Sequence, residues 1–133
     1  MSDLVAFLRA RLDEDERVAL AAAEESRTWT RQSHCDYSVP NLPIDDHTLW
    51  FGDRIVGEVG FGDGEMRPAE AEHIARHDPA RVLAEVDAKR RIVDRCEHYQ
   101  TYEDYGWALA DEVLSLLALP YADHPDYREE WRP

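Results

Sequence analysis

The 133-residue sequence lacks the features of a secreted or membrane-spanning protein. It has only two cysteines, Cys35 and Cys96, which are too few for a disulfide framework. Its first residues carry acidic side chains where a signal peptide needs a long apolar core. No uninterrupted apolar run approaches the roughly 20 residues of a membrane-spanning helix. These absences predict a cytoplasmic protein whose thiols are reduced.

Basic residues are also scarce. Lysine occurs once, at Lys89, and 15 basic side chains stand against 29 acidic ones, which gives a formal net charge of -14. This charge opposes binding to nucleic acid, whose affinity depends on Lys and Arg neutralising phosphates, and it opposes adsorption to anionic membranes. We therefore expect neither nucleic acid nor a membrane among the partners. The charge favours solubility, and it would suit a basic protein partner.

The length and composition predict one globular domain over residues 1–133. Helical periodicity occupies both ends of the chain, whereas short apolar runs broken by Gly, Pro, Asn and Asp occupy residues 26–67. The pattern predicts the α+β class, with a long N-terminal helix, a small antiparallel sheet of two to four strands, and two or three C-terminal helices on one face of the sheet.

The first predicted helix covers residues 3–25, and Ser2 can cap its N-terminus. Asp15 lies close to the apolar stripe of this helix. We expect its carboxylate to reach water at the edge of the stripe, and the alternative is an ion pair with an arginine of another helix. The stripe consists of residues at helical spacing, namely Leu4, Val5, Leu8, Leu12, Ala19, Ala22 and Ala23.

Strand signals are confined to the middle of the chain. Residues 28–30 and 35–39 could form edge strands. Aromatic and β-branched residues at 48–51 and 54–59 flank Gly52-Asp53, a pair that suits a tight turn. These residues predict a hairpin.

Helical signals return at Pro68 and continue to Pro120. We predict a short helix over residues 68–77 and a second helix from Pro79 to about residue 100, capped by Asp78. A last helix is expected over residues 104–119, stopped by Pro120. The residues expected to point inward are Val82, Leu83, Val86, Ile92, Val93 and Cys96 of the second helix, and Leu109, Val113, Leu116 and Leu117 of the last.

The stretch HIARHDP, residues 73–79, places His73 and His77 four residues apart on one helix. Side chains at this spacing stand one above the other, as two histidines must to bind one zinc ion. No glutamate follows His73, so the general base of the H-E-x-x-H proteases is missing. We interpret His77 first as a residue that satisfies free carbonyls at the helix end. The alternative is a zinc site with a third ligand from Cys35, Cys96, His98, Asp78 or Asp15.

The tail YADHPDYREEWRP contains too many aromatic residues for a linker. We expect residues 120–133 to pack back onto the domain through Tyr121, Tyr127 and Trp131. The alternative is a partner-binding edge formed by His124, Tyr127 and Trp131, because interfaces favour Trp, Tyr and Arg side chains. A folded-back tail could also help to close a homodimer.

Three segments, LVAFLRARLDEDERVALAAA, HIARHDPARVLAEVDAKRRIV and LLALPYADHPDYREEWRP, resemble a family of small actinobacterial and actinophage proteins that is a domain of unknown function. The resemblance covers the first helix and the last half of the chain. Residues 26–67 depart more, with Ser26-Arg27-Thr28-Trp29 where family members often carry Gly-Pro-Trp. The resemblance implies a common fold and origin, and it supplies no reaction.

Together these features predict a non-enzymatic accessory or interaction protein, phage- or mobile-element-associated as the resemblance implies. We predict no catalytic residue and no cofactor, and we expect the binding surface to combine the HIARHDP stretch with the tail. One competing function is a zinc protein or metal-dependent enzyme centred on His73 and His77. Another is a nucleic-acid mimic that inhibits a basic protein.

Overall fold

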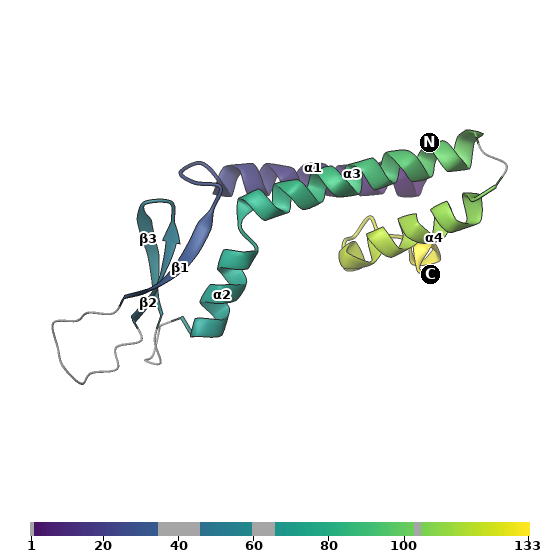
Figure 1. Cartoon of the computed structure of the whole chain (residues 1–133). Coiled ribbons are helices and arrows are strands. Elements are labelled where there is room, and N and C mark those ends of the chain that lie inside the picture. Colours follow the sequence, from purple (N-terminus) through teal and green to yellow (C-terminus); the bar gives the residue numbers. More distant parts are fainter. Residues whose placement is uncertain (1, 35–45, 60–65, 103–104) are drawn as a thin grey trace. The chain divides into compact units, whose positions relative to one another are not determined.

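A computed structural model of the chain describes residues 2–34, 46–59, 66–102 and 105–133. A long N-terminal helix, a small antiparallel sheet and further helices confirm the α+β class (Figure 1). The chain forms two compact units, residues 1–17 with 84–133 and residues 18–83, and one domain over the whole chain stays a prediction. The elements are α1 (Asp3–Ala22), β1 (Trp29–His34), β2 (Asp46–Phe51), β3 (Arg54–Val59), α2 (Pro68–Arg76), α3 (Pro79–Tyr102), α4 (Trp107–Ala118), η1 (Leu119–Tyr121) and η2 (Glu129–Trp131).

The unit of residues 18–83 contains a three-stranded antiparallel sheet in the order β1-β2-β3. The predicted hairpin is confirmed, with Gly52 in its turn at a φ of 62°. A Cβ atom at Gly52 would lie 2.8 Å from the Cβ of Ser26, so both backbone conformation and space require glycine there. Strand β1 begins at Trp29 and extends beyond the predicted 28–30, whereas the predicted strand 35–39 lies outside the described residues.

Asp78 joins the sheet to the helices of the same unit. Its Oδ1 accepts a hydrogen bond from the backbone N–H of Arg81 at 2.9 Å, which confirms the predicted cap of α3. Its Oδ2 accepts one from the backbone N–H of Trp29 at 3.3 Å, where β1 begins. The Trp29 ring stacks on Phe51 with centroids 3.8 Å apart, and α2 packs against β1 and β2 with Ala71 buried.

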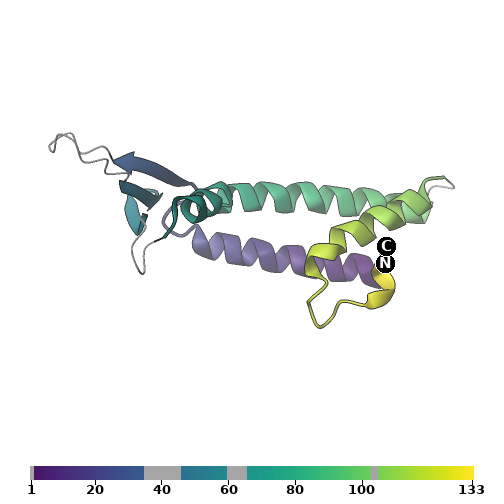
Figure 2. The same cartoon turned by 90° about the horizontal axis from the view of Figure 1, so that it is seen from below.

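In the other unit, α1 and α3 run antiparallel and side by side (Figures 1 and 2). Arg9 on α1 binds Asp94 at 2.8 Å and Glu97 at 2.7 Å on α3. Arg90 on α3 binds Asp13 at 2.7 Å and Glu16 at 2.8 Å on α1. Each helix therefore carries an arginine followed by acids four and seven residues later, and each arginine meets the acids of the other helix. Both helices bury apolar residues in this unit, namely Leu4, Val5, Phe7, Leu8, Leu12, Val86, Val93 and Cys96.

The prediction for α1 is mostly confirmed. The backbone N–H of Val5 donates to Ser2 Oγ at 3.2 Å, as expected of a cap. The helix ends at Ala22 rather than at residue 25, and Ala22 is exposed. Ala23 is half-buried, so the buried stripe does not reach the predicted end of this helix. On α3, the expected inward position of Ile92 is wrong, because that side chain is 40% exposed.

The predicted orientation of the last helix is wrong. Helix α4 begins at Trp107, after Gly106 with a φ of 92°, and not at residue 104. Leu109 is 66% exposed and Leu116 50% exposed, although both were expected to point inward. The physical reason is that α4 is apolar around most of its circumference, so periodicity does not define one inward face. The residues that are buried instead are Ala110, Leu114 and Ala118.

Candidate functional site

His77 lies at the C-terminal end of helix α2 and donates hydrogen bonds to backbone carbonyl oxygens of the last turn. Its backbone N–H donates to the carbonyl oxygens of His73 and Ile74 at 3.2 and 3.1 Å. The ring nitrogen Nδ1 lies 2.7 Å from the same oxygen of His73. Because a carbonyl oxygen can only accept, Nδ1 carries the proton and donates it. The geometry agrees with the interpretation of His77 as a residue of the helix end.

His73 and His77 lie side by side, with ring centroids 4.3 Å apart. Structural zinc sites take four protein ligands and catalytic sites three. Within the described parts of the chain, no group of three or more His, Cys, Asp or Glu side chains could hold a metal ion. Of the expected third ligands, Asp78 lies in the same unit with both carboxylate oxygens hydrogen-bonded to backbone. Cys35 is outside the described residues, and Cys96, His98 and Asp15 belong to the other unit.

The C-terminal tail packs against α1. Phe7 is the centre of the contact and is only 7% exposed. Trp131 lies nearest to it, with ring centroids 5.1 Å apart. Arg128 adds an ion pair with Asp3 at 2.8 Å. The other rings around Phe7 belong to Tyr121, His124 and Tyr127, at centroid distances of 6.4, 5.8 and 6.0 Å.

The expected partner-binding residues are therefore brought together, but their rings pack within the chain. His124 Nδ1 accepts a hydrogen bond from the backbone N–H of Asp126 at 3.1 Å, and Arg11 contacts the other ring nitrogen. An open groove of about 460 Å³ remains beside this cluster, lined by Phe7, Tyr127 and Trp131 among others. Its charged residues have both signs, which gives the groove no preference for a charged ligand.

Asp15 is half-buried and binds the tail. Its Oδ2 accepts a hydrogen bond from the Tyr121 hydroxyl at 2.5 Å, a partner that neither expectation for this carboxylate, water or an arginine, included. Burial, followed by the hydrogen bond to Asp15, raises the pKa of the Tyr121 hydroxyl above its ordinary value. The protonated hydroxyl is thus the form that holds the tail on α1.

Replacing Tyr121 with phenylalanine is expected to cost about 1 kcal/mol at neutral pH, because one hydrogen bond is lost. The raised pKa means that folding favours the protonated hydroxyl. This contribution is fully present below the unfolded-state pKa of about 10 and is lost as the pH rises through the folded-state pKa. The difference in melting temperature between the wild type and Tyr121→Phe should be smaller at about pH 10.5 than at about pH 7. A constant difference, or a similar effect of Tyr102→Phe at a well exposed position, would contradict the assignment.

Helix α4 exposes several of its apolar side chains. Leu109, Val113 and Leu116 follow the spacing i, i+4, i+7 and therefore share one face. Val113 is half-buried, whereas Leu109 and Leu116 are exposed. Trp107, at the start of the helix, is 59% exposed, but it lies on the opposite face, together with Asp111 and Leu114. We call Leu109, Val113 and Leu116, with the adjacent Glu112, the α4 surface.

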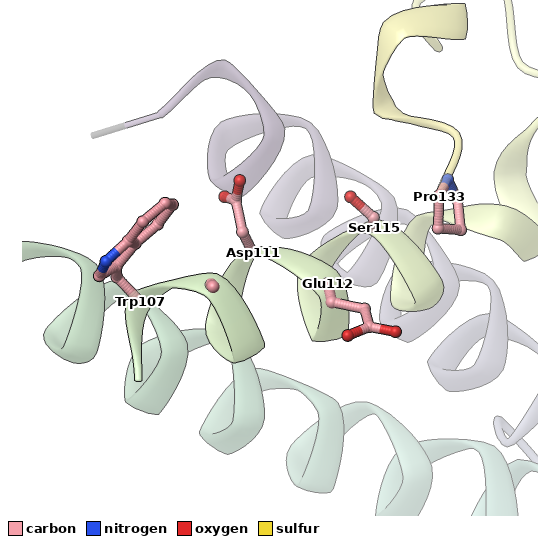
Figure 3. A pocket seen from close by; sticks show the side chains of 6 residues that line it. Trp107, Asp111, Glu112, Ser115 and Pro133 are labelled. Carbon is pink, nitrogen blue, oxygen red and sulfur yellow. The ribbon is translucent and has the colours of Figure 1, made fainter. Parts of the chain in front are cut away.

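A hollow of about 410 Å³ lies along another side of α4 (Figure 3). Trp107 and Asp111 lie at one end of it, and Ser115 lies near Pro133 at the other. Gln100 on α3 donates to Asp111 Oδ1 at 2.6 Å, which holds that carboxylate toward α3. Asp111 and Glu112 are the charged residues of α4, so the hollow has negative charge beside an aromatic ring.

Comparison with known proteins identifies a family but no activity. Residues 1–133 match DUF6221, a family of unknown function. The chain belongs to this family. Membership in DUF6221 confirms the predicted likeness to a family of unknown function, and the match includes residues 26–67, where the sequence departs more from the expected motifs. Comparison with curated proteins and with solved structures gave no significant match.

Membership in DUF6221 assigns no chemistry to this chain. No helix in the described ranges is both long enough and apolar enough to cross a membrane.

Sequence reasoning missed Phe7, although an aromatic residue beside the apolar stripe of a helix could have indicated a second packing face. It also missed Trp107 and Asp111, for which the sequence offered no signal, because a tryptophan in an apolar helix usually indicates burial.

Proposed function

We propose that this protein is a non-enzymatic accessory protein that binds a basic protein partner. The observation that carries the proposal is the α4 surface, where Leu109 and Leu116 are each at least half exposed while the opposite face of the helix is buried at Leu114 and Ala118. Clustered exposed apolar side chains are typical of protein interaction sites. The net charge of -14 favours a partner of opposite charge.

The α4 surface supports this function better than the tail does. His124, Tyr127 and Trp131 direct their rings at Phe7, so a partner would have to displace contacts that the chain already makes. Leu109 and Leu116 offer their side chains without such a cost. In this proposal the tail therefore stabilises the unit, and α4 contacts the partner.

Affinity capture from native cytosol tests the proposal. The wild type should retain one basic protein in stoichiometric amount, and Leu109→Gln/Leu116→Gln should lose it. Val18→Gln/Leu20→Gln is the matched control, because it makes the same number of apolar-to-polar changes at exposed positions on α1. Capture that survives the α4 substitutions, or loss that is equal in the control, would overturn the proposal.

A further inference from the structure

We infer that His73 and His77 form a surface site for a divalent copper ion. The site lies within the unit of residues 18–83 and does not depend on the function proposed above. Both histidines are exposed at the C-terminal end of α2, four residues apart, so one ion can reach both rings from solvent. Imidazole nitrogen is a ligand that suits copper, nickel and zinc.

The hydrogen bond made by the His77 ring presents a nitrogen to a metal. Nδ1 donates its proton to the backbone oxygen of His73 at 2.7 Å, so the free lone pair is on Nε2. Histidines that bind metals almost always donate their other ring N–H to a carbonyl, a carboxylate or water, which fixes the tautomer and the orientation of the ring. The contact that ends α2 therefore also gives His77 the arrangement of a metal ligand.

The distance between the two rings favours coordination at a right angle. A metal about 2.0 Å from one nitrogen of each ring would separate the ring centres by about 4.5 Å for bonds at a right angle, and by about 5.2 Å for bonds at a tetrahedral angle. The centroids of His73 and His77 are 4.3 Å apart. This separation is closer to the tetragonal geometry of Cu²⁺ than to the tetrahedral geometry of zinc.

The carboxylates nearest in sequence already have partners. Glu70 accepts hydrogen bonds from the Arg67 guanidinium at 2.7 and 3.0 Å and from the Arg67 backbone N–H at 2.9 Å. Glu72 binds Arg76 at 2.7 Å. Both oxygens of Asp78 accept from backbone N–H groups. The two imidazoles are therefore the donors that the chain offers at this point.

A site with two protein ligands suits copper better than zinc. Within the described ranges, no third His, Cys, Asp or Glu side chain joins the pair. Zinc sites take three or four protein ligands, whereas Cu²⁺ accepts nitrogen donors together with oxygen donors such as water in a tetragonal arrangement. For a given set of nitrogen ligands, Cu²⁺ is also the divalent ion of its series that binds most tightly.

The test is isothermal titration calorimetry with CuCl₂ and the full-length, untagged chain, with glycine as a weak competing chelator. Every protein carries Cys35→Ser, because Cu²⁺ oxidises accessible thiols, whereas Cys96 is buried. One equivalent should bind. His73→Asn and His77→Asn should each weaken binding at least about tenfold, a difference of about 1.4 kcal/mol, because the second ring binds an ion that the first already holds.

His98→Asn is the matched control, because it removes an exposed histidine of α3 that has no histidine four residues away. It should leave the affinity unchanged. Pulsed electron paramagnetic resonance, which detects the remote nitrogen of each bound imidazole, should show two imidazoles in the control and one or none in His73→Asn. Melting temperatures measured without metal verify that each variant is folded, and His73→Asn leaves the His77 backbone contacts in place.

Three results would overturn the copper site. The first is a spectrum of the parent protein with a single imidazole, and the second is equal weakening by His98→Asn. The third is tighter binding of Zn²⁺ than of Cu²⁺ in the same buffer, which would indicate a tetrahedral site with further ligands. Loss of binding in both α2 variants, with two imidazoles in the control, supports it.

Discussion

Replacing Leu114 with alanine is expected to lower the free energy of unfolding by about 2–5 kcal/mol, because a fully buried side chain would leave a cavity. Leu109→Ala on the same helix should change it by less than about 0.5 kcal/mol, since Leu109 is mostly in solvent. Urea denaturation followed by circular dichroism measures both values. The two substitutions remove the same atoms from one helix, so each is the matched control of the other.

The pair also tests the orientation of α4 on which the proposed function depends. If the helix had the orientation expected from its sequence, Leu109→Ala would be the costly change. If Leu109→Ala lowered the free energy of unfolding more than Leu114→Ala did, Leu109 would be buried and the α4 surface would not exist as described. The measurement needs no partner and no ligand, and it should precede the binding experiments.

Replacing Phe7 with alanine is expected to cost about 3–5 kcal/mol, because a buried aromatic ring is lost. The tail should detach as well, since Tyr121, His124, Tyr127 and Trp131 all contact this ring. Limited digestion with trypsin should then cleave after Arg128 faster than in the wild type, as mass spectrometry of the released fragment would show.

A double-mutant cycle with Trp131 separates tail docking from general destabilisation. If Phe7 acts through the tail, Phe7→Ala and Trp131→Ala remove one shared contact, so their combined cost should fall short of the sum by about 0.5–3 kcal/mol. Val93→Ala is a control at a buried position on α3 for which no contact with this ring cluster is described. Strict additivity of the Phe7 and Trp131 changes would contradict the role of Phe7 as the centre of the cluster.

Features encoded by neighbouring residues could be predicted from the sequence. Gly52-Asp53 between two apolar runs determined the hairpin, and Asp78-Pro79 determined the start of α3. Ser2 was recognised as a cap for the same reason. In each case the chemistry lies within about four residues, where turn and cap preferences are strong.

Features that depend on distant residues could not be predicted. The hydrogen bond from Tyr121 to Asp15 joins positions 106 residues apart, so nothing near Asp15 indicates its partner. The inward face of α4 depends on which residues fit against the rest of the unit, and the small side chains of Ala110 and Ala118 are buried where larger leucines were expected. The α4 surface could not be predicted for the same reason, because it lies on the face of the helix opposite these buried residues.

The reciprocal ion pairs of Arg9 and Arg90 also restrict how α1 and α3 can slide along each other. If α3 moved by one turn, about 5.4 Å, in one direction, Arg9 would face Arg90 and the two guanidinium groups would repel. If α3 moved by one turn in the opposite direction, both arginines would lose contact with the carboxylates that they bind. The charges thus penalise misalignment in both directions, although salt bridges at such partly exposed positions add little to stability itself.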